Sequence, residues 1–492
     1  MKDLQKKMSK TDIALVLTNT RWYGKRPWVI MPLTIAILTT LLKEAGIDFT
    51  LVDANLYNYD EQMLTKELSS LNPKIIMVSS SSIEYYQCSD RTIKIAKQAC
   101  PAATTILGGI YPTVLPQEAM KSSSLDYAFL GPAEERLPFF LELLIHNNIK
   151  KAMEQPGIGY HDEKQQPVIN PINFTDKLKA IEPDYSYIDI DGYLTQKTYS
   201  HYHYVKFTEP TVILLTSYGC SYNCCFCASA SIRGRHVSYR DPEYVLEEID
   251  FFYNQYNIRH FAIQDELFLA NKKRVKIILQ GIIDRKYEIT WKQVNGSVWH
   301  LDDEILELMK KSGCKILFVS VESGSQRVLK DIIGKPIDLN MVPSVVKKCN
   351  NVGLWISANF VIGFPGETWD EIRQTFKLAE DLTLDCASFT IATPLPKTEL
   401  YDICVRENLL PSNFDFTDPQ YIGYGKGLIS TDQFTPNELM ILRAFEWDRI
   451  NFSSPEKCRV FADVHNMTLE EVEEQRRQTR RHIGLYYQEL DA

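Results

Sequence analysis

The sequence lacks long apolar runs, an apolar leader and any excess of basic residues. No apolar stretch reaches the roughly 20 residues that span a bilayer. The opening residues MKDLQKKMSKTD lack the apolar part of a secretory signal. The 54 basic and 63 acidic residues give a net charge of −9, which provides no general attraction to nucleic acid or to an anionic membrane. We therefore expect a cytoplasmic protein with no nucleic-acid partner and no membrane partner.

Internal repeats and low-complexity tracts are also absent, and 492 residues are too many for one hydrophobic core. The length predicts two or three domains. Cysteine is the residue that is concentrated, because four of the 11 cysteines lie within the eight residues CSYNCCFC that begin at Cys220. In the reducing cytoplasm such clustered thiols indicate a metal site or catalysis rather than disulfides.

Residues 1–150 alternate between short apolar runs and helical stretches, which predicts an α/β fold with a doubly wound, Rossmann- or flavodoxin-like parallel sheet. Such sheets bind ligands at the carboxyl ends of their strands. Small and polar residues are also common in ordinary loops, so the spacing leaves both a ligand site and plain loop chemistry open. Strands are expected at 12–17, 48–54, 74–80, 103–109 and 126–131, and the residues near their ends include Asp53, Asn55, Ser79, Ser80, Gly108, Gly109 and Gly131.

Three further regions follow along the chain. Residues 151–210 are rich in Pro, Asp and Tyr and are expected to form a linker with one hairpin. Residues 211–408 contain six strand–helix units, which predict a partial (βα)6 barrel with its active site at the carboxyl ends of the strands. Residues 409–492 have the periodicity and charge of a small helical domain. The barrel strands are expected at 212–217, 260–266, 290–296, 316–323, 357–364 and 386–393.

The cysteine loop follows the first barrel strand, where the barrel architecture places chemistry. Cys220, Cys224 and Cys227 have the spacing C-x3-C-x2-C. Three thiolates can hold three irons of a [4Fe–4S] cubane and leave the fourth iron open for a ligand. The spacing alone leaves two alternatives, a structural zinc site completed by His236 and a redox disulfide between Cys224 and Cys227.

The pattern C-x3-C-x-aromatic-C, with Phe226 at the aromatic position, resembles the radical S-adenosylmethionine (SAM) superfamily. The resemblance implies that the three cysteines bind a [4Fe–4S] cluster whose open iron binds SAM. It also implies an external reductant, such as flavodoxin or ferredoxin, and cleavage of SAM to a 5′-deoxyadenosyl radical. SAM contacts are then implied for Phe226, for Gln264 and Asp265, for Glu322 and Ser323, and for Gly363 and Pro365.

The first 150 residues resemble the cobalamin-binding domain found in one subclass of this superfamily. The resemblance is carried by the stretches MPLTIAILTTLLKEAGIDFTLVDA, ILGGIYPTVLPQEA and DYAFLGPAEE. The motif Asp-x-His-x-x-Gly is absent, which implies a cobalt without a histidine ligand below it. The resemblance assigns the polar and glycine residues at the ends of the N-terminal strands to cobalamin.

Most understood members of the subclass are class B methyltransferases. The segment SGSQRVLKDIIGKPIDL resembles the C-methyltransferase of fosfomycin biosynthesis. This implies transfer of a methyl group from methylcobalamin to an unactivated carbon of a small natural-product substrate, with Tyr218 and Glu266 as candidate proton acceptors. Two alternatives are a cobalamin-dependent radical cyclase that transfers no methyl group and a non-enzymatic cobalamin or iron–sulfur sensor or electron carrier.

Overall fold

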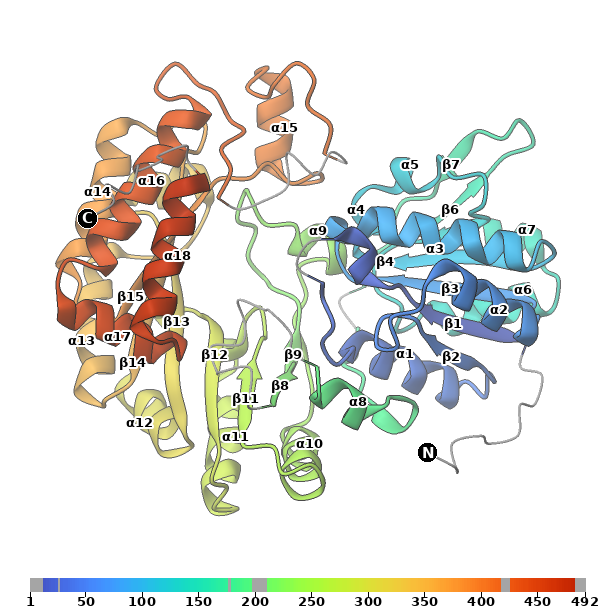
Figure 1. The fold of residues 1–492 in the computed structure, drawn as a ribbon, viewed down its shortest axis with the longest axis horizontal. Helices are drawn as coiled ribbons and strands as arrows, with labels where there is room; N and C mark the ends of the chain where they lie inside the picture. The colour runs from blue at the N-terminus through green and yellow to red at the C-terminus, as the bar shows by residue number, and fades with distance from the viewer. Residues whose placement is uncertain (1–11, 25–26, 176–177, 197–209, 417–424, 483–492) are drawn as a thin grey trace, which may run out of the picture. The chain divides into compact units, whose positions relative to one another are not determined.

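Two compact units divide the chain in the computed structural model, which describes residues 12–24, 27–175, 178–196, 210–416 and 425–482. Unit 1 comprises Met1–Ser200 together with Ser229–Arg240, and unit 2 comprises His201–Ala228 together with Asp241–Ala492. The chain therefore leaves unit 2 for twelve residues after the cysteine loop and then returns (Figure 1). Each unit contains its own sheet, parallel throughout in unit 2 and mostly parallel in unit 1.

In the described part of unit 1, seven strands form a sheet in the order β2-β1-β3-β4-β5-β6-β7. The first five strands are parallel, and their register places Leu17 beside Asp53 and Ser79. The doubly wound sheet expected from the sequence is confirmed. The strands are β1 (Ile13–Leu17), β2 (Thr50–Asp53), β3 (Ile75–Ser80), β4 (Thr104–Gly109), β5 (Tyr127–Phe129), β6 (Ile158–His161) and β7 (Pro167–Ile169).

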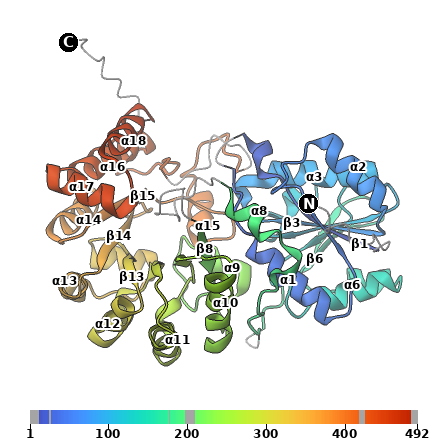
Figure 2. The same ribbon diagram turned by 60° about the horizontal axis from the view of Figure 1, so that its bottom comes forward.

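Alternating side chains of these strands pack on opposite faces of the sheet, so both faces need a helical cover. Ala14, Val16, Ile76 and Val78 belong to one apolar cluster, whereas their neighbours Ile13, Leu15, Ile75 and Met77 are buried outside it. Figure 2 shows α2 and α3 on one face and α1 and α6 on the other. The helices are α1 (Leu33–Glu44), α2 (Glu61–Leu71), α3 (Tyr86–Ala99), α4 (Ile110–Val114), α5 (Pro116–Ala119), α6 (Leu137–Ile145) and α7 (Ile149–Met153).

The hairpin expected within residues 151–210 is formed by β6 and β7 and extends the first sheet. β5 pairs antiparallel with β6, and β6 pairs antiparallel with β7. Residues 158–169 are therefore part of the sheet rather than of a connecting segment, and the first unit extends well beyond residue 150. The remainder of that region contains α8 (Ile190–Leu194), and its residues 176–177 and 197–209 lie outside the described part of the chain.

The sheet of unit 2 has six parallel strands in sequential order, β15-β14-β13-β12-β11-β8, within its described residues. A sheet that grows by one strand per βα unit is what an open, partial barrel requires. The expected six strand–helix units are thus confirmed. The strands are β8 (Thr211–Leu214), β11 (His260–Ile263), β12 (Thr290–Gly296), β13 (Cys314–Glu322), β14 (Trp355–Ile362) and β15 (Cys386–Ile391).

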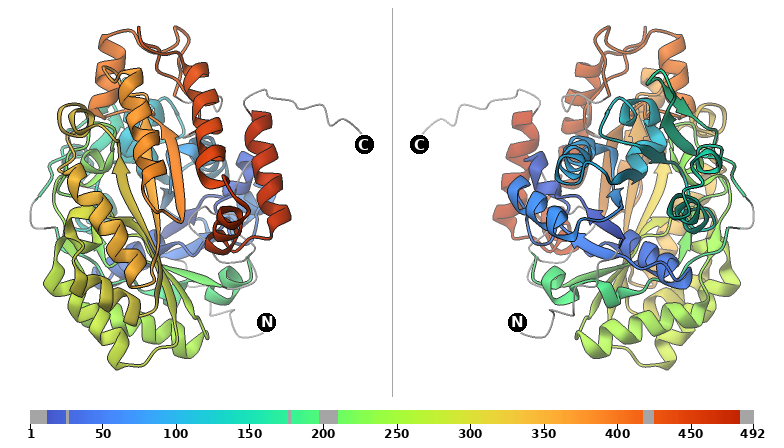
Figure 3. Two further views of the ribbon diagram at one scale, coloured as in Figure 1. Left: turned by 90° about the vertical axis from the view of Figure 1, so that its left-hand side faces the viewer. Right: turned by 90° about the vertical axis from the view of Figure 1, so that its right-hand side faces the viewer.

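Helices cover the outer face of this sheet, as Figure 1 and the left view of Figure 3 show. Their starts are fixed by local signals. Asp241, Asp302 and Thr368 cap three of them, and Thr368 with Glu371 forms a capping box. The helices on this face are α10 (Pro242–Gln255), α11 (Lys272–Asp284), α12 (Asp303–Lys311), α13 (Val342–Asn351) and α14 (Trp369–Asp381), and α15 (Glu399–Arg406) follows β15.

The C-terminal region is helical, as the periodicity predicts, and it closes the free edge of the second sheet. β15 is the last strand, so its outer backbone groups need partners. Asn451 partners two of them, because its side-chain oxygen accepts from Ala387 N at 2.8 Å and its amide donates to Ala387 O at 2.9 Å, and Arg443 donates to Phe389 O at 3.2 Å. The helices are α16 (Pro436–Asn451), α17 (Pro455–His465) and α18 (Leu469–His482). No helix among the described residues is both long and apolar enough to cross a membrane.

Candidate active site

The cysteine loop follows β8 and is pinned by the backbone of Cys225. Cys225 N–H donates to Ile333 O at 3.0 Å, and Cys225 O accepts from Leu400 N–H at 2.9 Å. The Cys225 side chain is buried, whereas Cys227 is exposed and Cys220 and Cys224 are half-buried. The loop therefore fixes the middle of the CCFC stretch and leaves the other three thiols nearer its surface.

Burial raises the pKa of the Cys220 and Cys224 thiols. Burial is the main cause at Cys220 and raises the pKa of Cys224 to about 12, and Cys227 adds to both shifts. A bound iron ion opposes such shifts because it stabilises the thiolate form. All three cysteines are free thiols, although no three Cys, His, Asp or Glu side chains in the described part of the chain stand as a preassembled ligand group. The donor set itself, three thiols on one short loop, fits an iron–sulfur cluster.

A buried ion pair lies beside the loop. Lys335 Nζ is 2.6 Å from Glu322 Oε1 and also donates to Ser320 O at 2.8 Å. The two side chains are 10% and 7% exposed. The Lys335 charge lowers the pKa of Cys220 and of Cys224, against the larger effect of burial. Lys335 was not singled out from the sequence, although it lies in the segment SGSQRVLKDIIGKPIDL that carries the resemblance.

The two acidic residues after β11 contact the start of the cysteine loop. Asp265, fully buried, accepts from Thr216 N, Thr216 Oγ1 and Ser217 Oγ, each at 2.6 Å. The carboxylate of Glu266, which is exposed, accepts from Gly219 N–H. These bonds make both residues supports of the loop. Gln264 precedes them, half-buried, with its N–H bonded to Leu214 O, and Tyr218 is buried within the loop.

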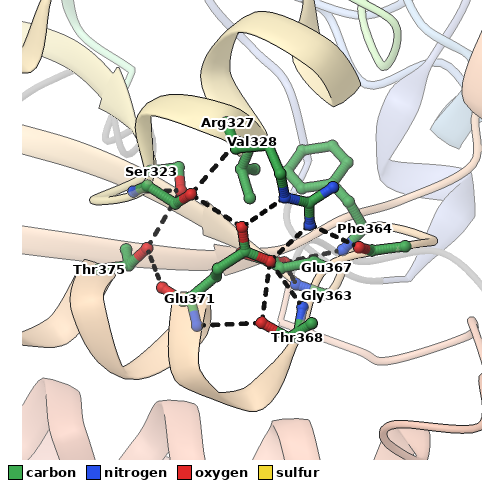
Figure 4. Close-up of polar contacts among 11 residues, drawn as sticks. Ser323, Arg327, Val328, Gly363, Phe364, Glu367, Thr368, Glu371 and Thr375 are labelled. Carbon is green, nitrogen blue, oxygen red and sulfur yellow. Dashed lines mark hydrogen bonds and ion pairs between the residues drawn. The ribbon is translucent and has the colours of Figure 1, made fainter.

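The ends of β13 and β14 are joined by a network around Glu371 (Figure 4). Glu371 accepts from Arg327 Nε at 2.7 Å, from Ser325 Oγ at 2.9 Å and from Thr368 Oγ1 at 2.9 Å. Ser323 is fully buried, and its hydroxyl accepts from Ser325 N–H at 3.1 Å and lies 3.3 Å from Thr375 Oγ1. The network fixes the backbone at both strand ends. Glu322, beside it, has a φ of +72°, a strained value for a residue that is not glycine.

The loop after β14 brings the sequence GFPGE against the cysteine loop. The rings of Phe226 and Phe364 lie with centroids 5.7 Å apart. Glu367 accepts from Gly363 N–H at 2.6 Å and from Phe364 N–H at 3.0 Å, and Pro365 is half-buried between them and the helix start. The structure thus places Phe226, Gly363 and Pro365 in one neighbourhood, as their assignment to a common ligand requires.

One buried lysine lies on the inner face of the barrel. Trp291 bonds to Ser312 O on the helical side, so the side chain of the next residue, Lys292, points the opposite way. Lys292 is 4% exposed, and burial lowers its pKa well below the ordinary value. A lysine within the apolar strand TWKQVNG was a signal in the sequence, but it was not interpreted as functional.

The strand ends of unit 1 form two halves. In the filled half, after β2, the polar side chains are taken up by contacts within the unit, and in the open half, after β3, β4 and β5, the glycines are half-exposed. Asp53 accepts from Tyr193 O–H at 2.6 Å, and Asn55 accepts from Thr20 Oγ1 at 2.8 Å and donates to Trp28 O. Asp53 and Asn55 are both buried, and burial raises the pKa of Asp53. These two side chains are therefore occupied by contacts within unit 1.

The open half lies at the ends of β3, β4 and β5. Ser79 and Ser80 are in register with Gly108 and Gly109, and the three glycines Gly108, Gly109 and Gly131 are half-exposed. Gly109 has a φ of +104°, and a Cβ there would overlap Ser80 O. Gly131 N–H bonds to Thr113 Oγ1 at 2.8 Å. This backbone-lined edge suits a large ligand that lies close against the main chain.

Comparison with known proteins agrees with the division of the chain into two units. The model of the radical SAM superfamily matches residues 214–379, and that of the B12 binding domain matches residues 24–141. The chain is 24% identical to cytidylyl-2-hydroxyethylphosphonate methyltransferase of Streptomyces wedmorensis, over 86% of each chain. It is 25% identical to the anaerobic magnesium-protoporphyrin IX monomethyl ester cyclase of Rubrivivax gelatinosus, over 75% of this chain and 65% of the relative.

Its fold is also that of the radical SAM methyltransferase TsrM from Kitasatospora setae, solved with cobalamin and a [4Fe–4S] cluster. The TM-score is 0.70 at 16% identity, and the match covers 96% of this chain and 100% of that one. A cysteine loop on a parallel barrel sheet, joined to a B12 binding domain, defines a cobalamin-dependent radical SAM enzyme. The chain belongs to this family, the B12-binding radical SAM enzymes.

Its cofactors are accordingly a [4Fe–4S] cluster, SAM and cobalamin. The zinc and disulfide alternatives for the cysteine loop are set aside. Three thiols suit the cluster, the Phe226–Phe364 neighbourhood suits an adenine ring, and the glycine-lined edge of unit 1 suits cobalamin. The assignment of individual residues to each cofactor remains a prediction.

Proposed function

We propose that this enzyme replaces a hydrogen atom on an unactivated carbon of a small-molecule substrate with a methyl group. When bound, the cluster supplies the electron that cleaves SAM to a 5′-deoxyadenosyl radical, and methylcobalamin supplies the methyl group. The observation that carries the proposal is the combination of the cysteine loop with a B12 domain in a chain aligned with a named methyltransferase over 86% of both lengths.

The overall reaction balances without a proton. One substrate C–H bond and two SAM molecules give one C–CH3 bond, S-adenosylhomocysteine, 5′-deoxyadenosine and methionine, with two electrons from an external reductant. The substrate hydrogen leaves in 5′-deoxyadenosine. A proton acceptor is therefore not required at an sp3 carbon, so Tyr218 and Glu266 need not act as bases. The bond from Gly219 N–H to Glu266 and the burial of Tyr218 support a role for both in shaping the cysteine loop.

The residues of this chain act by holding and orienting. Cys220, Cys224 and Cys227 are proposed to bind the cluster, with Lys335 providing a positive charge beside them. Phe226 and the loop after β14 are proposed to flank adenine. Lys292, buried on the inner face of the barrel, is proposed to orient a polar group of the substrate.

The test needs no substrate. Purified protein is reconstituted with iron and sulfide under anaerobic conditions, loaded with hydroxocobalamin, and incubated with a chemical reductant and SAM carrying a deuterated methyl group. We expect 5′-deoxyadenosine and deuterated methylcobalamin by mass spectrometry. Absence of 5′-deoxyadenosine would contradict the radical assignment. 5′-Deoxyadenosine without labelled methylcobalamin would contradict methyl transfer.

The second outcome would favour the cyclase alternative, which rests on the 25% identity to the anaerobic cyclase over 385 residues. The sensor or electron-carrier alternative predicts neither product, although cobalamin or the iron–sulfur cluster would still bind. The Cys225→Ala variant is the matched control for the Cys224→Ala variant. Both changes remove a thiol from the same loop, but only Cys224 is a proposed cluster ligand.

A further inference from the structure

The segment after the cysteine loop belongs to the other unit. α9 (Ser229–Arg233) begins two residues after Cys227, and the whole segment Ser229–Arg240 is part of unit 1. The preceding strand, β8, belongs to unit 2. The cysteine loop therefore connects a strand of unit 2 directly to a segment of unit 1.

Polar contacts fasten this segment to unit 1 at three positions. Arg233 is 2.5 Å from Glu134, Ser238 Oγ donates to Leu178 O at 2.6 Å, and Arg240 is 2.5 Å from Glu182. The Arg240 side chain is only 1% exposed. The Glu134 side chain is 7% exposed, so loss of Arg233 or of Glu182 would leave a desolvated charge on Glu134 or on Arg240.

The first of these contacts reaches the open half of the strand ends in unit 1. Glu134 lies three residues after Gly131, in the loop that follows β5, and its side chain is 7% exposed. α9 also packs against α4, the helix that starts directly after Gly109. α4 in turn holds Gly131, because Thr113 Oγ1 accepts its N–H. α9 thus contacts the segments that follow Gly109 and Gly131.

We propose that the Glu134–Arg233 ion pair couples cobalamin binding in unit 1 to cluster binding in the cysteine loop. Cobalamin bound at the glycine-lined edge would fix the loop that carries Glu134 and, through Arg233, the downstream end of the cysteine loop. Cluster ligation by Cys227 would fix the same end from the other side. Two ligands that order one shared element favour each other's binding, and the coupling is equal in both directions.

The inference rests on the cofactors and not on methyl transfer, so the two can fail separately. Arg233 and Glu134 are positioning residues, because neither is assigned to a cofactor. Their measurable property is a ratio: the cobalamin dissociation constant of the cluster-free protein divided by that of the cluster-loaded protein. General loss of stability would weaken both forms, whereas loss of coupling changes the ratio.

The experiment titrates the full chain with hydroxocobalamin by absorbance, before and after anaerobic reconstitution of the cluster. We expect a ratio of at least about 5 in the unmodified protein, at the lower end of typical coupling. Arg233→Met and Glu134→Gln are each expected to bring the ratio within about twofold of one. Arg233→Lys keeps the charge and is expected to retain most of the coupling.

Lys97→Met is the matched control, because it breaks another ion pair of unit 1, with Asp126 at the start of β5, and leaves the Glu134 loop intact. Its ratio should equal that of the unmodified protein. A ratio near one in the unmodified protein, or an unchanged ratio in Arg233→Met, overturns the inference. If Arg233→Met does not fold, Glu134→Gln and Arg233→Lys are compared instead. An unchanged ratio in Glu134→Gln then overturns the inference.

Discussion

The two parallel sheets of this protein present opposite chemistry at the same structural position. At the open strand ends of unit 1 lie the buried Ser79 and Ser80 in register with the half-exposed Gly108 and Gly109, with no charged side chain among them. At the strand ends of unit 2 lie charged side chains with fixed partners, among them Glu322 with Lys335 and Glu371 with Arg327. Both sheets obey the rule that parallel strands bind ligands at their carboxyl ends.

The difference follows from what each sheet has to hold. A large preformed cofactor such as cobalamin makes extensive contact, so side chains must be removed from its path. A cluster on a short loop carries charge in a small space, so nearby charges must be balanced. The comparison suggests that substitutions at the first sheet act mainly through shape and those at the second mainly through charge.

The cysteine loop gives the largest expected effect. Cys220→Ala, Cys224→Ala and Cys227→Ala should each abolish 5′-deoxyadenosine formation and most of the bound iron, because two thiolates cannot hold the cubane in place. Iron and sulfide content with mass spectrometry of the products measures this. Cys225→Ala should keep both properties, since its thiol is buried and only its backbone pins the loop. Iron loss in Cys225→Ala equal to that in Cys224→Ala would contradict the ligand assignment.

Gly109→Ala tests the role of shape in the first sheet. The new methyl group would overlap Ser80 O, and the φ of +104° is unfavourable for alanine. Overlap and backbone strain together should lower the free energy of unfolding by about 4 kcal/mol and abolish cobalamin binding. The melting temperature and hydroxocobalamin titration measure the two effects.

Gly24→Ala is its control, because Gly24 also has a positive φ of +74° but a Cβ there meets nothing within 4 Å. Its free energy of unfolding should fall by only about 1 kcal/mol, the cost of the backbone conformation, and its cobalamin affinity should be unchanged. Equal losses in the two variants would show that conformation rather than space decides at Gly109.

Lys335→Met tests the role of charge in the second sheet. It leaves Glu322 buried without its counter-ion, which should cost about 3 kcal/mol in the cluster-free protein. Adding Glu322→Gln should recover most of that stability, because the unpaired charge is then gone. The double variant should still hold the cluster less tightly than the unmodified protein, since the positive charge beside Cys220 and Cys224 is missing. Thermal unfolding and the rate of iron loss to a chelator separate the two effects.

Sequence periodicity is sufficient to predict most strands and helices of the two sheets, because buried parallel strands are short apolar runs between amphipathic helices. The cysteine spacing identified the chemistry for the same reason, since metal ligands on one loop are local. Residue partners distant in sequence were missed. Tyr193 contacts Asp53 across 140 positions, and Arg233 contacts Glu134 across 99. No local pattern encodes such pairs, so the transfer of residues 229–240 to unit 1 could not be predicted.

Two glutamates four residues apart give the smallest and most specific prediction. Glu367 is fully buried, and burial raises its pKa from 4.5 to about 7. Arg327 lowers the pKa of Glu371 to about 2. As the pH rises from 4.5 to 7, the unfolded chain loses the Glu367 proton while the folded protein keeps it, so folding becomes less favourable by at most about 3 kcal/mol. The Glu371 contribution is constant in that window, because it is lost only as the pH falls from 4.5 through about 2.

Glu367→Gln should therefore remove part of the pH dependence of stability and change little at pH 5. The difference in urea midpoint between Glu367→Gln and the unmodified protein should grow in favour of the variant up to about pH 7 and then level off. Glu371→Gln should lower the midpoint by a similar amount at every pH in this range, because it weakens the Arg327 pair. A pH-independent difference for Glu367→Gln would mean that its carboxyl is already ionised in the folded protein. The contrast between sheets would then weaken, because burial would not be what controls charge at the end of β14.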